Sequence, residues 1–159
     1  MNTIMLNDWP LFELYQAMRG QILAVLTDDD LRFSPGGANP PLGVLCREIG
    51  ETQRSYIDSF KCFACDFAYR NPAPGLAESL ALLGAWYAQL DAELKTVVAG
   101  FTDDQLQNQR VTRGPNFTPS LHTQLSIYQE ALLIFYGKAS VYLKALNKPM
   151  PDQVRNWIA

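Results

Sequence analysis

The chain has 159 residues, of which 48% are hydrophobic and 18% charged, and its formal net charge is -3. This size and composition suit one globular domain, which we expect to span residues 1–159. An acidic chain whose basic residues are scattered is a poor match to a phosphate backbone, so we expect no nucleic-acid partner.

The N-terminal segment has no basic cluster, and Asp8 and Pro10 interrupt its apolar residues, so we expect no signal peptide. The longest apolar run, residues 131–136, is far too short to cross a bilayer. Three cysteines do not make a disulfide framework and are typical of a reducing compartment. The sequence therefore predicts a cytoplasmic protein with no membrane partner.

The first predicted helix runs from about Pro10 to Thr27, with Asp8 as its expected N-cap residue. Apolar residues at helical spacing define the face that we expect to be buried: Leu11, Tyr15, Met18, Ile22 and Leu26. Residues 34–41, which contain two glycines and three prolines, form a loop before the next helix.

The second predicted helix runs from about Pro41 to Phe60. Its expected buried face carries Leu42, Leu45, Ile49, Thr52, Tyr56 and Phe60. Its opposite face, which we expect to meet solvent, carries Arg47, Glu51, Arg54 and Asp58. Residues 61–75 finish this helix and continue as a loop that Pro72 and Pro74 close.

The third predicted helix runs from about Leu76 to Gly100. Its expected buried residues are Leu76, Leu80, Leu83, Tyr87, Leu90, Leu94, Val97 and Phe101. Thr102 is typical of the N-cap of a short helical turn. The polar segment 107–117 follows, and Val111 is the one residue in it that we expect to reach the core.

The fourth predicted helix, from about Thr118 to Leu146, has the most regular apolar stripe, with spacings that alternate between four and three. The stripe consists of Leu121, Leu125, Tyr128, Leu132, Phe135, Ala139, Tyr142 and Leu146. Gly137 lies in mid-helix, where we expect a neighbouring helix to approach closely. Residues 147–149 end the helix, and a terminal turn over 151–159 is expected to pack Val154, Trp157 and Ile158 on it.

Four long amphipathic helices without a strand predict an all-α fold, a four-helix bundle. The connections are longer than tight turns, so they permit an up-down-down-up order as well as up-down-up-down.

Two segments resemble the DinB-like family: LCREIGETQRSYI at residues 45–57, and EALLIFYGKASVYLKALNKP at residues 130–149. The resemblance implies a four-helix bundle in up-down-down-up order. Many members hold a divalent metal through three histidines, one on the second helix and two on the fourth, and related thiol transferases use this metal to activate a low-molecular-weight thiol. Because members often pair through helix faces, we expect a homodimer.

The resemblance places the three metal-ligand positions on Glu48, Ala131 and Phe135, and the chain contains one histidine in all. Zinc takes about four ligands, and at least three of them usually come from protein. We therefore expect the family's metal site to be absent and no cofactor to be bound.

The same positions define a candidate pocket for a small apolar ligand, consisting of Glu48, Thr52, Tyr128, Ala131, Phe135 and Lys138. In this interpretation Lys138 is the expected partner of Glu48, and Tyr128 offers a hydroxyl. The plainer interpretation is that Glu48 is a carboxylate at the rim of the bundle, either solvated or paired.

Two other functions stay open at this point. One is a metal-dependent thiol transferase with altered ligands, such as Glu48, His122 or the pair Cys62 and Cys65; the other is a non-catalytic dimeric interaction module. The plainer interpretation makes His122 a surface residue near a helix start and makes both cysteines partly buried small side chains, although a reversible disulfide between them is an alternative. Cys46 is expected to be packed.

Overall fold

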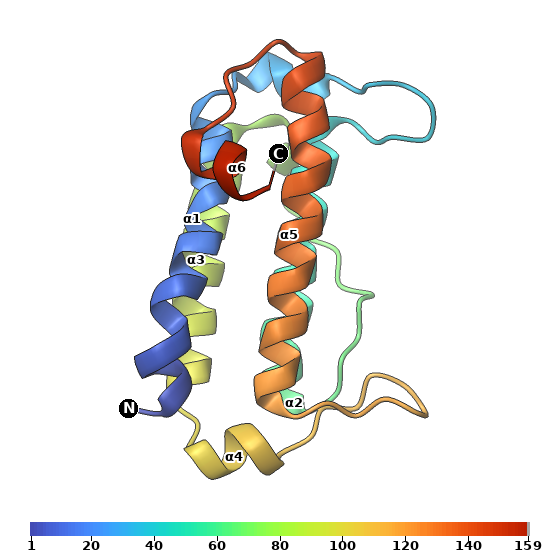
Figure 1. Cartoon of the computed structure of the whole chain (residues 1–159). Helices are drawn as coiled ribbons and strands as arrows, with labels where there is room; N and C mark the ends of the chain where they lie inside the picture. The colour runs from blue at the N-terminus through green and yellow to red at the C-terminus, as the bar shows by residue number, and fades with distance from the viewer. Residues whose placement is uncertain (159) are drawn as a thin grey trace.

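The structure, a computed structural model, describes residues 1–158 (Figure 1). Ala159, the last residue of the predicted domain and of its terminal turn, lies outside the described residues. The helical elements in chain order are η1 (Ile4–Asp8), α1 (Trp9–Ala24), η2 (Asp28–Arg32), α2 (Leu42–Cys62), η3 (Leu76–Glu78), α3 (Leu80–Ala99), α4 (Asp103–Asn108), α5 (Leu121–Ala145) and α6 (Asp152–Trp157). Over this part of the chain, β-pairing is limited to isolated bridges.

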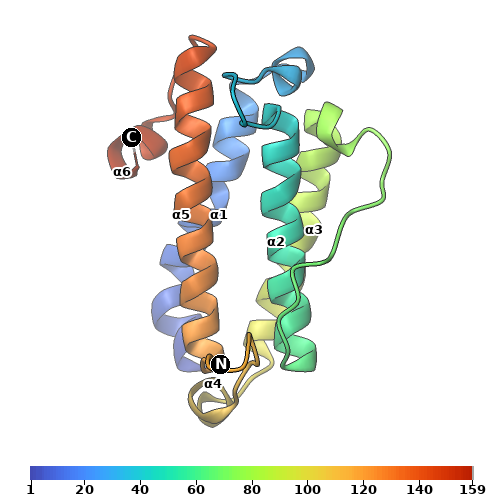
Figure 2. The ribbon, with the colours of Figure 1, turned by 90° about the vertical axis from the view of Figure 1, so that its right-hand side faces the viewer.

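The four long helices α1, α2, α3 and α5 form a bundle in up-down-down-up order, so the predicted all-α, DinB-like architecture is confirmed (Figures 1 and 2). Helix α2 packs on both α3 and α5, and α1 packs on the same two helices from the other side. Because α2 and α3 run in the same direction, the chain must return along the bundle between them. Residues 63–75, which we call the strap, make this return alongside α2 (Figure 2).

The helix ends follow local capping chemistry, with small corrections to the predicted bounds. Thr102 caps α4 in a reciprocal arrangement with Gln105, as its sequence predicts. Ser120, rather than a residue near 118, caps α5 by accepting a hydrogen bond from the Thr123 N–H at 3.2 Å. Asp8 makes no capping hydrogen bond, because the π-helical turn η1 already supplies helical backbone before it.

One mid-helix glycine marks the close approach of two helices, but it is Gly50 and not Gly137. A Cβ atom at Gly50 would lie 2.3 Å from the Trp86 ring of α3, whereas a Cβ atom at Gly137 would meet nothing within 4 Å. The prediction for Gly137 is therefore wrong. Gly50 instead lets α2 and α3 pack closely around the indole of Trp86.

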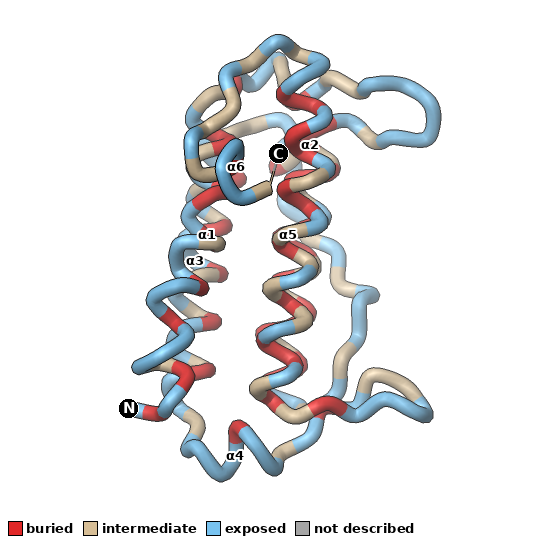
Figure 3. Tube along the Cα trace, viewed as in Figure 1, coloured by how far each residue is buried: buried red, intermediate tan, exposed pale blue. Residues whose placement is uncertain are grey.

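The core confirms the predicted stripe of α5, since its members from Leu121 to Tyr142 are all buried (Figure 3). Val111 and Val154 are also fully buried, whereas Trp157 is exposed. None of the helices in residues 1–158 combines the length and apolar character needed to cross a membrane.

The predicted buried face of the first helix is confirmed at Met18, Ile22 and Leu26, which are buried, but it is wrong at Leu11, which is 49% exposed. Phe12 and two polar residues, Gln16 and Arg19, are also buried, and the Arg19 side chain is only 1% exposed. Apolar periodicity alone could not show this, because two of the inward positions are polar.

Arg19 lies at the centre of a buried polar network, which we call the Arg19 network: Arg19, Gln16, Gln53 and Asp91. The guanidinium donates one hydrogen bond to Gln53 Oε1 at 2.6 Å and another to Asp91 Oδ1. The amides of Gln16 and Gln53 donate to the same Asp91 oxygen at 2.7 and 2.8 Å. The network therefore ties α1, α2 and α3 together with charge-assisted hydrogen bonds.

We predict that Asp91→Ala destabilises the protein by about 3 kcal/mol, because it leaves the Arg19 charge buried without a counterion. Chemical denaturation followed by circular dichroism measures the change. Glu13→Ala is the matched control, since its ion pair with Lys95 also joins α1 to α3 but is about half exposed on both sides. That control should cost less than about 1 kcal/mol, and equal losses in the two variants would contradict the prediction.

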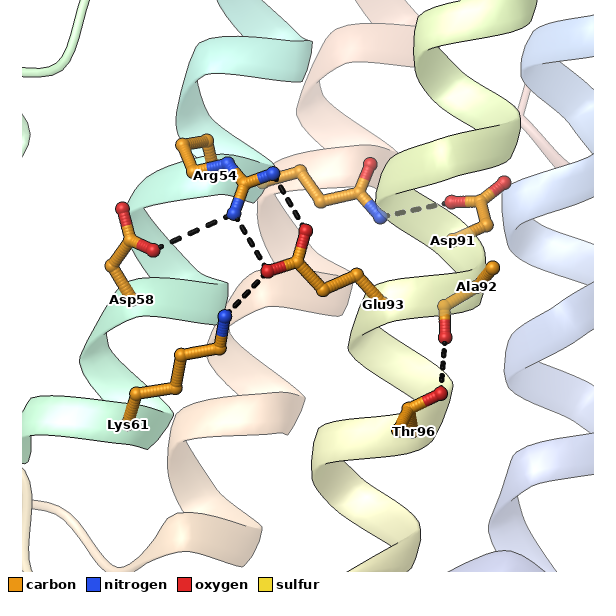
Figure 4. Close-up of polar contacts among 8 residues, drawn as sticks. Arg54, Asp58, Lys61, Asp91, Ala92, Glu93 and Thr96 are labelled. Carbon is orange, nitrogen blue, oxygen red and sulfur yellow. Dashed lines mark hydrogen bonds and ion pairs between the residues drawn. The ribbon is translucent and has the colours of Figure 1, made fainter.

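A second ion-pair cluster joins α2 and α3 on the outside of the bundle (Figure 4). Arg54 donates two hydrogen bonds to the Glu93 carboxylate, at 2.8 and 2.6 Å, and Lys61 donates a third. The hydrogen bonds from Arg54, followed by that from Lys61, lower the pKa of Glu93 to about 2. Glu93 therefore favours the folded state when it is ionised.

This lowered pKa predicts a pH dependence of stability. Glu93 stabilises the fold above the pKa of an unfolded glutamate, 4.5, and this contribution is lost as the pH falls from there to about 2. In urea denaturation across that range, the stability difference between the natural protein and Glu93→Gln should shrink and disappear near the acid end. A difference that does not change with pH would contradict this assignment.

Candidate functional site

A groove between the antiparallel helices α2 and α5 contains a hollow of about 210 Å³, which we call the α2–α5 groove. Its lining consists of Leu45, Glu48, Ile49 and Thr52 from α2, and of Ala131, Ile134, Phe135 and Lys138 from α5. The lining residues recur at three- and four-residue spacing, so each helix presents one continuous strip to the groove.

Five of the six residues of the candidate pocket lie together in this lining: Glu48, Thr52, Ala131, Phe135 and Lys138. Tyr128 does not line the hollow and is fully buried in the core, with its ring 5.8 Å from that of Phe12 and 5.1 Å from that of Tyr56. Its hydroxyl has no hydrogen-bond partner within residues 1–158. Tyr128 is therefore a core residue that does not offer its hydroxyl to a ligand in this hollow.

The expected ion pair between Glu48 and Lys138 is not present in the described residues. Both residues are exposed and stand on opposite helices, with the apolar side chains of Ala131 and Phe135 also lining the space between the helices. Each charge is free to meet solvent or a ligand. The hollow thus has an apolar floor, with an acidic group from α2 on one side and a basic group from α5 on the other.

The three positions that the resemblance assigns to metal ligands do not fit a metal here. Glu48 offers an exposed carboxylate, but Ala131 offers a methyl group and Phe135 a ring that is 4% exposed. Within residues 1–158, no cluster of three or more His, Cys, Asp or Glu side chains is placed to hold a metal ion. One oxygen ligand beside two apolar side chains does not meet the coordination that zinc or a similar ion requires.

The other proposed ligands lie elsewhere. His122 is in the first turn of α5, with its Nε2 atom 3.8 Å from Asp8 Oδ2 and its Nδ1 atom 3.3 Å from Gln107 Nε2. It lines a different hollow, between α5 and the start of α1. His122 is therefore well separated in the fold from Glu48.

The cysteines are all free thiols in different surroundings. Cys62 is exposed, rather than partly buried as expected, because α2 extends to this residue and carries it to the end of the bundle. Cys65 is half-buried in the strap, and burial raises the pKa of its thiol. Cys46 is fully buried, as expected, and burial raises its pKa to about 12. Raised pKa values disfavour the thiolate that metal binding or nucleophilic attack needs.

The strap brings in residues that sequence periodicity did not identify. Glu51 was expected on the solvent face of α2 but is 4% exposed, since the strap covers it. Its carboxylate accepts a hydrogen bond from the Asn71 N–H at 3.0 Å and lies 3.3 Å from Arg47 Nε. A hydrophobic period reports which side of a helix faces other helices, but it carries no information about the path of an irregular segment.

Comparison with known proteins supports the fold and not a particular activity. No family model matches the sequence, and no curated protein matches it. A crystal structure of a DinB-like protein, YjoA, from Bacillus subtilis superposes with a TM-score of 0.66. The alignment covers 86% of this chain and 90% of that chain, with 11% sequence identity. The chain therefore has a DinB-like helical fold.

We predict that Ala131→His combined with Phe135→His creates a zinc site with Glu48, because the two positions are one helical turn apart on the wall opposite Glu48. Isothermal titration calorimetry with zinc measures the affinity, after circular dichroism has confirmed that the variant folds. Ala81→His with Ala85→His is the matched control, since it places the same pair of residues at the same spacing on exposed positions of α3, outside the groove.

The designed pair should bind zinc at least about tenfold more tightly than the control pair, and adding Glu48→Ala should remove most of that advantage. Equal affinities in the designed and control variants would show that positions 131 and 135 do not face Glu48 in a ligating geometry.

Proposed function

We propose that this chain is a DinB-like bundle protein that has lost the three-histidine metal site and binds a small, largely apolar molecule in the α2–α5 groove. The observation that carries this proposal is the hollow itself, which has an apolar floor formed by Leu45, Ile49 and Phe135. Its lining includes Glu48, Ala131 and Phe135, the positions that the resemblance assigns to the family's metal ligands. Removing such surface from water favours binding by roughly 25 cal/mol for each square ångström of apolar area.

The size of the site limits the ligand. The hollow is about 210 Å³, and an adjoining hollow of about 280 Å³ shares Leu45, Glu48 and Lys138 with it. The adjoining space is bounded by residues 38–40 and Tyr142, whose hydroxyl donates a hydrogen bond to the Pro40 carbonyl at 2.7 Å. Together the two spaces favour an elongated molecule over a compact one, with Glu48 and Lys138 beside its middle.

Binding without metal chemistry is the function that this lining supports best. Its polar groups are one carboxylate, one ammonium and one hydroxyl, from Glu48, Lys138 and Thr52. Few convergent polar groups on a mostly apolar surface are typical of a small-molecule site, where they fix orientation. A metal-dependent thiol transferase with altered ligands is less well supported, because His122 and the Cys62–Cys65 pair lie away from the groove.

A dimeric interaction module is the second candidate, and one observation favours it. Ile134 and Val141 are 61% and 54% exposed, although both lie on α5 beside the groove. A second copy of the chain that covered these residues would bury apolar surface and close the groove from outside. Sedimentation velocity tests this candidate: a monomer at micromolar concentration would rule it out, and Ile134→Lys should dissociate a dimer that forms through this face.

We predict that Ala131→Phe blocks the groove, because the larger side chain fills the hollow from the α5 side. N-phenyl-naphthylamine, a neutral apolar fluorophore, is the probe, and its fluorescence titration should show a loss of at least about tenfold in affinity. Ala88→Phe, at an exposed position of α3, is the control and should leave the affinity unchanged. If the two variants bind the probe equally well, the groove is not its site.

A further inference from the structure

A second hollow, of about 270 Å³, lies between α2 and the strap, and we call it the strap hollow. Arg47, Glu51 and Ser55 line it from α2, while Phe67 and Arg70 line it from the strap. Glu48 and Thr52 form the wall that it shares with the α2–α5 groove. Its lining is dominated by charged and hydroxyl groups, so its chemistry differs from that of the apolar groove.

The acidic group in this hollow is fixed in place. The Glu51 carboxylate is 4% exposed, accepts the Asn71 N–H at 3.0 Å, and lies 3.3 Å from Arg47 Nε and 3.9 Å from Arg70 Nε. One carboxylate thus holds two arginines from different segments. Groups held in advance lose less entropy when a ligand binds, which raises affinity.

Two further polar groups of α2 line the hollow. Ser55 is one of them and is only 3% exposed. The buried Nε atom of Arg47 has no hydrogen-bond partner within residues 1–158, although it lies 3.3 Å from the Glu51 carboxylate. Buried polar groups are nearly always paired, so these groups favour a polar ligand.

An aromatic ring forms one side of the strap hollow. Phe67 is 44% exposed, yet its ring is held by an edge contact with Tyr56 at 5.7 Å and by the guanidinium of Arg113 at 5.3 Å. A fixed and partly exposed ring offers a flat apolar surface for a ligand's side chain.

The charges select the class of ligand. Two guanidiniums, from Arg47 and Arg70, face two carboxylates, from Glu48 and Glu51, so the lining is neutral overall. A phosphate or another polyanion would meet both carboxylates, whereas a ligand with one charge of each sign would complement both sets. A free guanidinium edge suits a carboxylate, which it can bind through two parallel hydrogen bonds.

We propose that the strap hollow binds a small amino-acid-like zwitterion. Its carboxylate meets the terminal nitrogens of Arg47, its ammonium group lies toward Glu48, the Ser55 hydroxyl supplies a further hydrogen bond, and its side chain lies against Phe67. This site is separate from the α2–α5 groove, and it does not depend on the function proposed for that groove.

The test titrates L-phenylalanine into the full chain and follows the backbone amide resonances by NMR. We expect saturable shifts at Ser55, Phe67 and Arg70. L-phenylalaninamide, which lacks the carboxylate, and N-acetyl-L-phenylalanine, which lacks the ammonium group, should each bind at least about tenfold more weakly. The proposal would be overturned if L-phenylalanine caused no shifts at these residues, or if either derivative or inorganic phosphate bound as tightly as L-phenylalanine.

Variants separate this site from the groove. Arg47→Met should weaken L-phenylalanine at least about tenfold, and Ser55→Ala, which alters no charge, should weaken it about threefold. Arg32→Met, at an exposed arginine that does not line the strap hollow, is the matched control and should have no effect. Ala131→Phe should leave this binding intact while it blocks the apolar probe. Unchanged binding in both Arg47→Met and Ser55→Ala would overturn the proposed site, whatever the result for the groove.

Discussion

The buried charge of Arg19 is the constraint on which the rest of the bundle depends. An isolated guanidinium in an apolar interior is costly, so the helices must assemble in the one arrangement that brings Gln53 of α2 and Asp91 of α3 to Arg19 of α1. The Tyr87 ring, 4.4 Å from the guanidinium, adds a cation–π contact. These directional contacts hold Arg19 on the inward side of α1, the side on which Phe12, Met18 and Ile22 are also buried.

With α1, α2 and α3 held together in this way, α5 completes the bundle through apolar contacts. Its inward stripe includes Leu132 and Phe135, and Phe135 also lines the α2–α5 groove. One stripe of side chains therefore contributes both to the packing of the bundle and to the apolar surface of the groove.

The helix order accounts for the second hollow. Two consecutive helices that run in the same direction require a long return segment, and this segment lies against α2 because Glu51 binds the Asn71 N–H and attracts Arg70. The strap therefore covers charged residues that would otherwise face water. Because the helix order requires this return segment, the polar strap hollow forms between the strap and α2, beside the apolar groove. Glu48 lies on the wall between the two.

The sequence by itself determined the all-α class, the approximate bounds of the four long helices and the stripe of α5, because hydrophobic periodicity and helix capping are local signals. The grouping of Glu48, Ala131 and Phe135 came instead from the resemblance to the DinB-like family. The sequence also placed the opposite charges of Glu48 and Lys138 near one groove. It did not show that the two groups form no ion pair in the described residues. Only the tertiary structure decided the burial of Arg19 and Glu51, the absence of Tyr128 from the groove lining and the close approach at Gly50. Each of these depends on partners that are distant in the sequence, such as Asp91, Asn71 and Trp86, and a residue's periodicity within its own helix does not identify such partners.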